Sequence, residues 1–329
     1  MPYTALLTAL HSLSQEGFTS DQRDALRALC EYLEEPSPYA LFLLTGYAGT
    51  GKTFLLRTIT DLALQSGLRV ELMASTGRAA KVLSASTGRP ASTVHRTIYR
   101  ASTQMQEEGG SFQLGRVSAT TPTLFIVDEA SMIAGDTGEV SPFGSGNLLD
   151  DLLSYVWSAE DAKLIFVGDT AQLPPVGTSL SDALNAEVLT SRYGLHVYGM
   201  ELCEVVRQKR GGILHNATQL RELLDEYADE DPEALLPIHL ETEGLRGIFP
   251  VEPGTFIETL DDAYRKYGEE ECLVICPSNK LALECNHAIR SSVLYYEEEA
   301  VVQGERLIVT RNNYHYTKRP DRSDFIANG

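Results

Sequence analysis

The stretch from Gly46 to Thr53 constrains the fold of this chain more than any other feature of the sequence. It reads Gly-Tyr-Ala-Gly-Thr-Gly-Lys-Thr and fits the pattern G-x-x-x-x-G-K-[ST]. An apolar run from Leu41 to Thr45 precedes it, and a helix-forming run from Lys52 to Leu64 follows it. The pattern therefore predicts a buried parallel strand, a glycine-rich turn and a helix, which together form a cradle for phosphate groups.

The residue types in this stretch suit that chemistry. Gly46, Gly49 and Gly51 let the backbone curl so that its N–H groups, including those of Ala48 and Thr50, point at a phosphate. The helix that follows adds the partial positive charge of its N-terminus. A glycine-rich turn that binds nothing is the alternative, and the complete motif between a strand and a helix disfavours it.

Two side chains complete the phosphate site. Lys52 is expected to reach the β- and γ-phosphates of a nucleoside triphosphate, and the Thr53 hydroxyl is expected to take a coordination position of Mg²⁺. The motif thus predicts a nucleotide-binding site with Mg²⁺ as its cofactor.

The composition predicts a soluble globular protein. At 329 residues the chain has room for two domains, and 43% hydrophobic with 22% charged residues is an ordinary balance. We find no apolar run of the roughly 18 to 20 residues that would span a bilayer, and no secretory signal. Five cysteines, an odd number thinly spread, are typical of a reducing compartment. We therefore expect a cytoplasmic monomer with no membrane role.

The net charge of −19 argues at first against a polyanionic partner, but the charges are unevenly distributed. Residues 72–106 contain no Asp or Glu, whereas residues 222–271 are crowded with acids. The basic residues of the first segment are Arg78, Lys81, Arg89, Arg96 and Arg100. This segment could face the phosphates of a nucleic acid, and a solvated helical face is the alternative.

A helix is expected over Asp21 to Leu33, with Thr19 or Ser20 as its N-cap. Gln22 lies in its first turn, just upstream of the first strand. The amide of Gln22 could both donate to and accept from an adenine edge. An ordinary surface glutamine is an equally good interpretation, so the two stay open.

A second strand is expected over Arg69 to Ala74, and Thr76 opens the helical segment that follows it. Thr76 and the neighbouring N–H groups could hold an external phosphate. Further on, His95 and Arg96 stand close to Tyr99, a mixture of polar, cationic and aromatic groups that suits a single-stranded nucleic acid. A hydrogen-bonded structural role for His95 is as good an interpretation.

Acidic and amide side chains follow two more buried strands. The strand Thr123 to Val127 ends in Asp128 and Glu129, and the strand Lys163 to Val167 leads to Asp169 and Gln172. We expect Asp128 to hold Mg²⁺ through water and Glu129 to polarise the attacking water. Asp169 and Gln172 are expected at the same sheet edge, near the γ-phosphate.

By this point the motifs resemble those of a superfamily 1B DNA helicase of the RecD-like kind. They are GYAGTGKT, ASTGRAAKVL, STVHR, LFIVDEASM and VGDTAQLPPVG, and LCEVVRQ at residues 202–208 is similar to the next motif. The resemblance implies an α/β fold, a RecA-like P-loop NTPase domain with a parallel sheet, followed by part of a second RecA-like domain. It also implies that Arg207 is an arginine finger on the γ-phosphate.

The same resemblance implies roles for residues already singled out. It implies that Gln22 recognises adenine and that Gln172 couples hydrolysis to DNA. It also implies that Thr76 and His95 contact the DNA strand. Ser75 departs from the family, in which many members have Pro at that position.

We expect a first domain over residues 1–197, with a small hairpin-like insertion at about 101–121, and a partial second domain over 198–329. A strand is expected over Cys272 to Cys276, a helix over Lys280 to Val293 and a strand over Gly304 to Thr310. A metal site built from Cys272, Cys276 and Cys285 is disfavoured, because no second close pair of ligands exists. The later family motifs have no counterpart, and the sequence does not choose between a fragment and a natural truncation.

The sequence thus predicts an ATP hydrolase that acts as a helicase or translocase on single-stranded DNA, with ATP and Mg²⁺. The family resemblance alone implies that it moves 5′ to 3′. Recombination or repair proteins are further candidate partners. The alternative is a nucleotide-gated single-strand-binding ATPase module that does not unwind in this form. A P-loop kinase is disfavoured, because Asp128 and Glu129 favour water as the acceptor.

Overall fold

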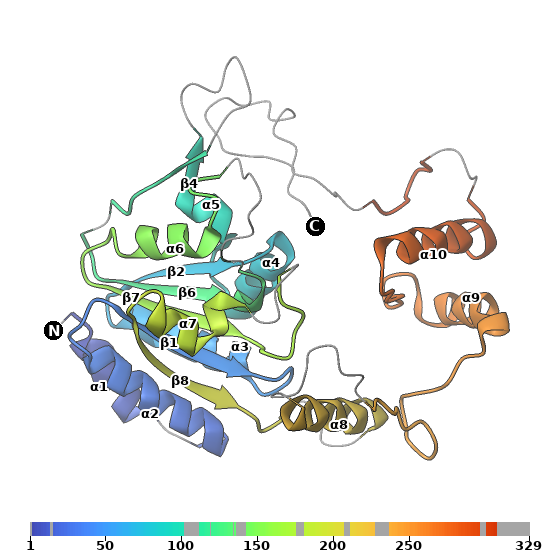
Figure 1. The fold of residues 1–329 in the computed structure, drawn as a ribbon, viewed down its shortest axis with the longest axis horizontal. Helices are drawn as coiled ribbons and strands as arrows, with labels where there is room; N and C mark the ends of the chain where they lie inside the picture. The colour runs from blue at the N-terminus through green and yellow to red at the C-terminus, as the bar shows by residue number, and fades with distance from the viewer. Residues whose placement is uncertain are drawn as a thin grey trace. The chain divides into compact units, whose positions relative to one another are not determined.

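The computed structural model describes residues 2–13, 16–101, 112–118, 120–133, 135, 143–175, 181–206, 211–227, 237–296 and 301–307. The chain forms two compact units, which Figure 1 shows with their elements. Unit 1 comprises Met1–Lys209 with Val309–Gly329, and unit 2 comprises Arg210–Ile308.

Unit 1 is built on a six-stranded parallel sheet, as the expected α/β fold class requires. The strands lie in the order β3-β2-β6-β7-β1-β8 and every adjacent pair is parallel. Their bounds are β1 Ala40–Gly46, β2 Arg69–Ala74, β3 Ala91–Thr93, β6 Thr123–Asp128, β7 Ala162–Gly168 and β8 His196–Leu202. A domain boundary between residues 197 and 198 would cut β8, which pairs with β1 along its whole length, so the first compact unit extends to Lys209.

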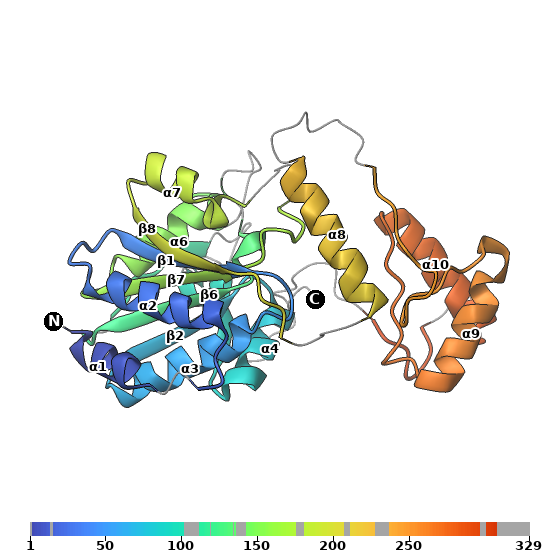
Figure 2. The same cartoon turned by 90° about the horizontal axis from the view of Figure 1, so that it is seen from below.

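Helices cover both faces of the sheet, as Figure 2 shows. One face carries α1 Thr4–Ser12, α2 Ser20–Glu34, α3 Lys52–Gln65 and α4 Gly77–Thr87, and the other carries α5 Val94–Ile98, α6 Leu148–Val156 and α7 Ala186–Ser191. Successive strand residues alternate between the two apolar cores: Phe42 and Leu44 belong to the first, Leu41 and Leu43 to the second. The central strands β1, β6 and β7 are therefore buried on both sides, which explains their continuous apolar runs.

Unit 1 also contains shorter elements outside the six-stranded sheet. Two 3-10 turns, η1 Ala130–Met132 and η2 Asp182–Leu184, lie near the carboxyl edge. The strands β4 Tyr99–Ala101 and β5 Phe112–Leu114 form a separate antiparallel pair. The rest of the expected insertion, residues 102–111 and 119, lies outside the described residues, and so does most of the glycine-rich stretch 134–146.

Unit 2 contains α8 Gly212–Glu226, the 3-10 turn η3 Pro253–Thr255, α9 Phe256–Tyr267 and α10 Asn279–Ser292. Where the structure describes this unit, it contains no strand, so the strand expected over Cys272 to Cys276 is wrong. The side chains of Leu273 and Ile275 are 81% and 87% exposed. An apolar run becomes a strand only when a neighbouring segment accepts its backbone hydrogen bonds, and none of the segments that the structure describes pairs with this run.

The last expected strand also differs. Residues 304–307 form a turn and an irregular segment, and residues 308–310 lie outside the described part of the chain. Across the described residues, no helix is long and apolar enough to cross a membrane.

Candidate active site

The carboxyl ends of the central strands bring the predicted catalytic residues to one edge of the sheet. Thr45 at the end of β1 pairs with Gly168 at the end of β7. Asp128 at the end of β6 pairs with Ala74, the last residue of β2. Because all the strands are parallel, the loops that follow them emerge side by side, and this edge is where ligands bind in such sheets.

The phosphate loop has the backbone that its glycines allow. Gly46, Gly49 and Gly51 have φ angles of 149°, 85° and 91°, in the region that other residues rarely adopt. Gly51 is the N-cap of α3. The Lys52 ammonium donates to the backbone oxygens of Gly46 and Tyr47 at 2.6 Å and 2.9 Å, so the side chain bends back over the loop.

Gln22 lies beside this loop and is 3% exposed, so it is not a surface residue. Its side-chain oxygen accepts from the Thr19 N–H at 3.2 Å, while the Thr19 hydroxyl accepts from the Gln22 N–H, and together they form a capping box on α2. Its amide nitrogen donates to the backbone oxygen of Thr50 at 3.0 Å. Gln22 therefore ties the start of α2 to the phosphate loop, and its amide would have to leave these partners to contact an adenine.

Asp128 and Glu129 form the acidic pair of the site. Burial, opposed by the backbone N–H of Glu129 and by the Lys52 ammonium, raises the pKa of Asp128 to about 6, and the nearby Glu129 charge adds to the rise. Glu129 has a φ of 52°, a left-handed conformation that is costly for a residue with a side chain and that clusters at functional sites. The pair follows β6 at the carboxyl edge of the parallel sheet, the same edge at which the phosphate loop follows β1.

The loop after β7 joins the same edge. Asp169 is 3% exposed and its carboxylate accepts the Ala171 N–H at 3.0 Å. The side-chain oxygen of Gln172 accepts from the Ser131 hydroxyl at 3.4 Å, although Gln172 is largely exposed. Since Ser131 belongs to η1, directly after Glu129, this contact connects the loop of Gln172 with the acidic pair.

Thr76 caps α4 at the end of β2. Its hydroxyl accepts from the Ala79 N–H at 3.2 Å, so its first role is structural. Arg78 follows in the first turn of α4 and is exposed. The Ser75 hydroxyl is buried and has no hydrogen-bond partner among the described residues, at the position where the family resemblance departs.

His95 packs in an aromatic group at the start of α5. Its ring centroid lies 5.2 Å from that of Phe143 and 5.8 Å from that of Tyr99. Burial lowers the pKa of His95, so the ring is neutral at pH 7. This packing favours the structural interpretation of His95, whereas Arg96 in the same short helix is exposed.

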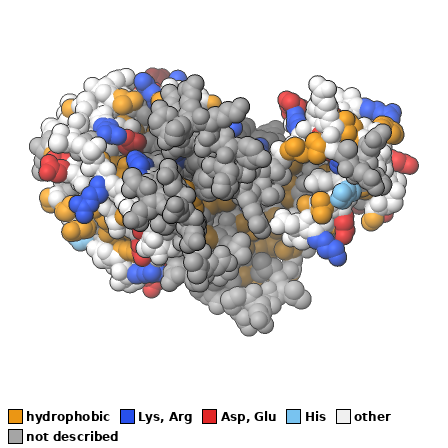
Figure 3. Space-filling view, turned by 90° about the horizontal axis from the view of Figure 1, so that it is seen from above, with side chains coloured by type: hydrophobic (Ala, Val, Ile, Leu, Met, Phe, Trp, Pro, Cys, Tyr) orange, Lys and Arg blue, Asp and Glu red, His pale blue; other side chains and the backbone are white. Residues whose placement is uncertain are grey.

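The basic segment does not act as one unbroken patch. The Arg89 guanidinium lies 3.6 Å from the Asp61 carboxylate, and Arg100 donates to the backbone oxygens of Thr97 and Tyr99, each at 2.9 Å. On the face drawn in Figure 3, basic and acidic side chains are interspersed over unit 1. Arg207, the expected arginine finger, lies outside the described residues.

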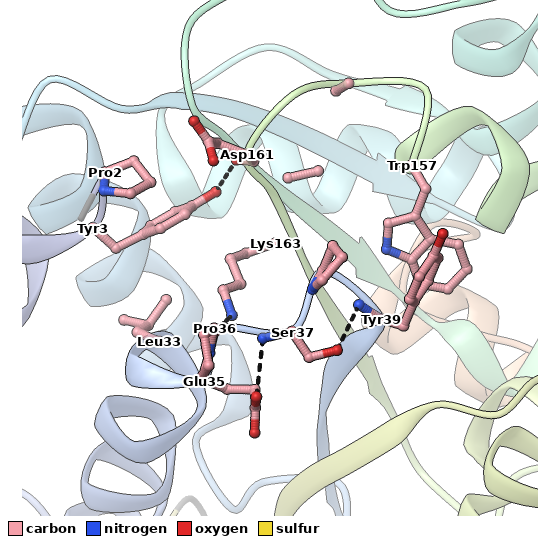
Figure 4. Close-up of a pocket in the computed structure, with 13 residues that line it drawn as sticks. Pro2, Tyr3, Leu33, Glu35, Pro36, Ser37, Tyr39, Trp157, Asp161 and Lys163 are labelled. Atoms are coloured by element: carbon pink, nitrogen blue, oxygen red, sulfur yellow. Dashed lines mark hydrogen bonds between the residues drawn. The ribbon is translucent and has the colours of Figure 1, made fainter.

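A cavity of about 470 Å³ lies at the opposite, amino-terminal edge of the sheet, where Trp157, Tyr39 and Lys163 line it (Figure 4). Several of its polar groups are paired within the protein. The Lys163 ammonium donates to the backbone oxygens of Tyr32 and Glu35 at 3.1 Å and 2.8 Å. Burial lowers the pKa of Lys163, while the Glu35 charge opposes that change. This cavity is therefore separate from the phosphate loop, and its paired groups serve the fold.

The structure also reveals a contact that the sequence analysis did not anticipate. The Asp21 carboxylate accepts the N–H groups of Cys203 and Glu204, and the Val206 N–H donates to the backbone oxygen of Gly49. The first partners are 182 and 183 positions away in the sequence, so no local pattern could indicate them. The only local signal is the place of Asp21 next to Gln22 in a capped first turn.

Comparisons with known proteins agree with the motifs. Residues 17–236 match the family model described as AAA domain. The ATP-dependent RecD2 DNA helicase of Deinococcus radiodurans is 35% identical over 183 residues, which cover 56% of this chain and 23% of that protein. The ATP-dependent DNA helicase dda of Enterobacteria phage T4 is 26% identical over 306 residues, which cover 89% of this chain and 61% of that protein.

Among solved structures, the Pif1 helicase from Candida albicans has a TM-score of 0.40 and 19% identity, and the match covers 78% of this chain and 56% of that one. The chain therefore spans less than two thirds of the length of each of these relatives.

Proposed function

Because this chain belongs to the AAA domain family and is a RecD-like P-loop helicase of superfamily 1B by its motifs and relatives, we propose that it couples ATP hydrolysis to movement along single-stranded DNA. The movement proposed is 5′ to 3′, by resemblance. The observation that carries the proposal is the meeting of the phosphate loop, the Asp128–Glu129 pair and the Gln172 loop at one sheet edge.

The residues at this edge and the expected arginine finger each have a proposed task in hydrolysis. The Lys52 ammonium would exchange its backbone partners Gly46 and Tyr47 for the β- and γ-phosphate oxygens of ATP. Glu129 would orient and deprotonate the attacking water, and Arg207 would stabilise charge on the transferred phosphoryl group. Gln22 would recognise the adenine after release from Thr50.

The residues present fit Mg²⁺. Asp128 is a half-buried carboxylate whose pKa is raised chiefly by desolvation, and Thr53 offers an exposed hydroxyl in the phosphate loop. Both are oxygen ligands of the kind that Mg²⁺ prefers. Bound there, the ion would neutralise phosphate charge, while Asp128 and Thr53 hold it in position.

The central test replaces Lys52. In Lys52→Ala we expect DNA-stimulated ATP hydrolysis to fall at least about 100-fold, because the variant loses the ammonium charge that Lys52 supplies at the phosphates. Steady-state phosphate release with and without single-stranded DNA measures the effect. Lys280→Ala, which removes an exposed lysine of α10, is the matched control and should hydrolyse ATP normally. An unchanged rate of DNA-stimulated ATP hydrolysis in Lys52→Ala would contradict the proposal.

For the DNA, we propose that exposed Arg78 and Arg96 contact phosphates of the strand, with Thr76 and His95 beside them. Arg78→Ala and Arg96→Ala should each weaken binding of a labelled oligothymidine. Each should also reduce the slope of log affinity against log salt by about 0.7, as expected for one lost phosphate contact. Arg27→Ala, which removes an exposed arginine of α2, is the control. A slope that stays unchanged in both variants would contradict the DNA assignment.

A second candidate function is a nucleotide-gated single-strand-binding ATPase that does not unwind. It is favoured by unit 2, whose described residues contain no strand and leave Leu273 and Ile275 exposed. Strand-displacement assays beside ATPase assays separate the two functions, on this 329-residue chain and on one extended beyond Gly329. Hydrolysis without displacement in the shorter chain alone would favour the binding module.

For the cell, we propose a cytoplasmic monomer that serves DNA recombination or repair beside other proteins of those processes. Its support is the low cysteine content and the kind of relative it matches.

A further inference from the structure

The segment Cys203–Val206, which follows β8, lies between the start of α2 and the phosphate loop. It has no regular secondary structure of its own. The N–H groups of Cys203 and Glu204 donate to the same carboxylate oxygen of Asp21, at 2.8 Å and 2.9 Å. The Val206 N–H donates to the Gly49 backbone oxygen at 2.9 Å. One end of the segment is thus held by α2 and the other by the phosphate loop.

The neighbours of Asp21 strengthen this arrangement. Ser20 donates its hydroxyl to the Glu204 carboxylate at 3.3 Å, and Gln22 donates its amide to the Thr50 backbone oxygen at 3.0 Å. Three successive residues of α2 therefore reach the segment or the phosphate loop. At the loop's first residue, a Cβ added to Gly46 would come within 2.5 Å of the Leu202 backbone oxygen, so the two backbones are in close contact.

The hydrogen bonds of Asp21 do more than stabilise its own helix. An acid in the first turn stabilises a helix through its dipole wherever its carboxylate points. Here the carboxylate instead accepts two N–H groups from a distant segment, in hydrogen bonds that are strengthened by its charge. The residue after Val206 is Arg207, the arginine finger that the family resemblance implies.

We propose that Asp21 is a positioning residue, which holds Cys203–Val206 against the phosphate loop and thereby sets the rate of hydrolysis. The inference rests on the proposed ATPase function. Asp21 acts through the segment whose N–H groups it accepts, so its loss lowers kcat while the phosphate loop, held independently by Gln22, keeps its affinity for nucleotide.

The experiment compares Asp21→Ala, Asp21→Asn and Asp24→Ala in the full chain. Asp24 is a neighbouring acid of α2 whose carboxylate lies 2.9 Å from the Arg27 guanidinium, so its loss removes a helix charge without touching the segment. In Asp21→Ala we expect DNA-stimulated kcat to fall about tenfold, with affinity for a non-hydrolysable ATP analogue within about twofold of the wild type. Asp21→Asn keeps an acceptor oxygen and should recover part of the rate.

Hydrogen exchange gives a readout that does not depend on activity. The amides of Cys203 and Glu204 should exchange faster in Asp21→Ala than in the wild type or in Asp24→Ala, while the β-sheet amides stay protected. Unchanged exchange together with an unchanged kcat in Asp21→Ala would overturn the inference. Loss of nucleotide affinity in proportion to kcat would also overturn it, because Asp21 would then support the loop itself.

Failure of the inference and failure of the proposed function give different results. If the wild type shows no DNA-stimulated hydrolysis, the function is wrong, and hydrogen exchange alone decides the role of Asp21 as an anchor. If the wild type is active and Asp21→Ala is equally active, only the positioning role is wrong. A double-mutant cycle with Arg207→Ala adds a last criterion: the two losses should be less than additive, and full additivity would contradict a route through Arg207.

Discussion

At the scale of a single residue, the ionised Asp128 carboxylate lowers the stability of the folded protein. Its pKa is raised to about 6, chiefly by burial, against about 3.9 for an unperturbed Asp. The folded protein therefore binds a proton between about pH 4 and pH 6 that the unfolded chain does not bind. For this group, stability is greatest below that window and declines as the pH rises through it.

Asp128→Asn removes the buried charge and keeps an oxygen that can accept the Glu129 N–H. We expect the nucleotide-free variant to be about 1 to 2 kcal/mol more stable than the wild type at pH 8, with the difference shrinking below about pH 6. Urea unfolding at pH 8 and pH 5 measures it, with the exposed Asp24→Asn as the control. A variant that is less stable at pH 8 would contradict this view of Asp128.

The same carboxylate gives the opposite pH dependence for the metal. Mg²⁺ needs the ionised form, so the affinity for Mg²⁺ with nucleotide should fall as the pH drops below about 6. Titration of a fluorescent nucleotide at several pH values, with and without Mg²⁺, tests the prediction. A Mg²⁺-dependent part of the affinity that stays constant from pH 7.5 to pH 5.5 would contradict it.

At the scale of elements, the phosphate loop depends on glycine for two separate reasons. Gly51 has a φ of 91°, and a Cβ there would also lie 2.3 Å from the Gln22 amide nitrogen. Gly67, at the end of α3, has a φ of 81° but nothing within 4 Å of such a Cβ. Both positions have the strained backbone, but only at Gly51 would an added Cβ come too close to another side chain, that of Gln22.

Comparing Gly51→Ala with Gly67→Ala separates the effect of the close contact with Gln22 from the effect of backbone strain. Gly67→Ala should lose about 1 kcal/mol of stability through strain alone. Gly51→Ala should lose about 1 kcal/mol more, because Gln22 must move and its hydrogen bond to Thr50 breaks, and nucleotide affinity should fall at least about tenfold. Urea unfolding and nucleotide titration measure both effects. Equal stability and equal affinity in the two variants would show that the Gln22 contact has no consequence.

At the scale of the whole molecule, the two units differ in how much core they bury. Both large apolar clusters draw their members from Tyr3 to Leu202, within unit 1. In the described part of unit 2, the buried apolar residues are Ile289 and Val293. Unit 1 therefore has the apolar burial that cooperative folding requires.

A chain shortened to end at Lys209 is expected to unfold cooperatively and to bind nucleotide with an affinity within about threefold of the full chain, because its sheet and phosphate loop are complete. Circular dichroism during heating and nucleotide titration provide the measurements. In limited proteolysis of the full chain, unit 2 should be cut before unit 1. Aggregation or a broad, non-cooperative transition of the shortened chain would contradict this division.

The elements that the sequence predicted are those with strong local signals. The runs that became β1, β6 and β7 are continuous and apolar, because burial on both faces demands it. The N-cap at Thr19 and the turn before α3 follow from side-chain and glycine chemistry within a few residues. By contrast, β8 is an edge strand with mixed exposure, and its sequence has no continuous apolar run. The segment Cys272–Cys276 has such a run but does not form a strand.

By itself, then, the sequence determined the phosphate loop, the acidic pair after β6 and their meeting at one edge, because a parallel sheet brings successive strand ends together. Only the tertiary structure decided that Gln22 is buried against Thr50, that β8 belongs to the first unit, and that Asp21 holds Cys203–Val206 beside Gly49. Those contacts join residues far apart in the chain, and their partners depend on the packing of α2 and β8 rather than on any local pattern.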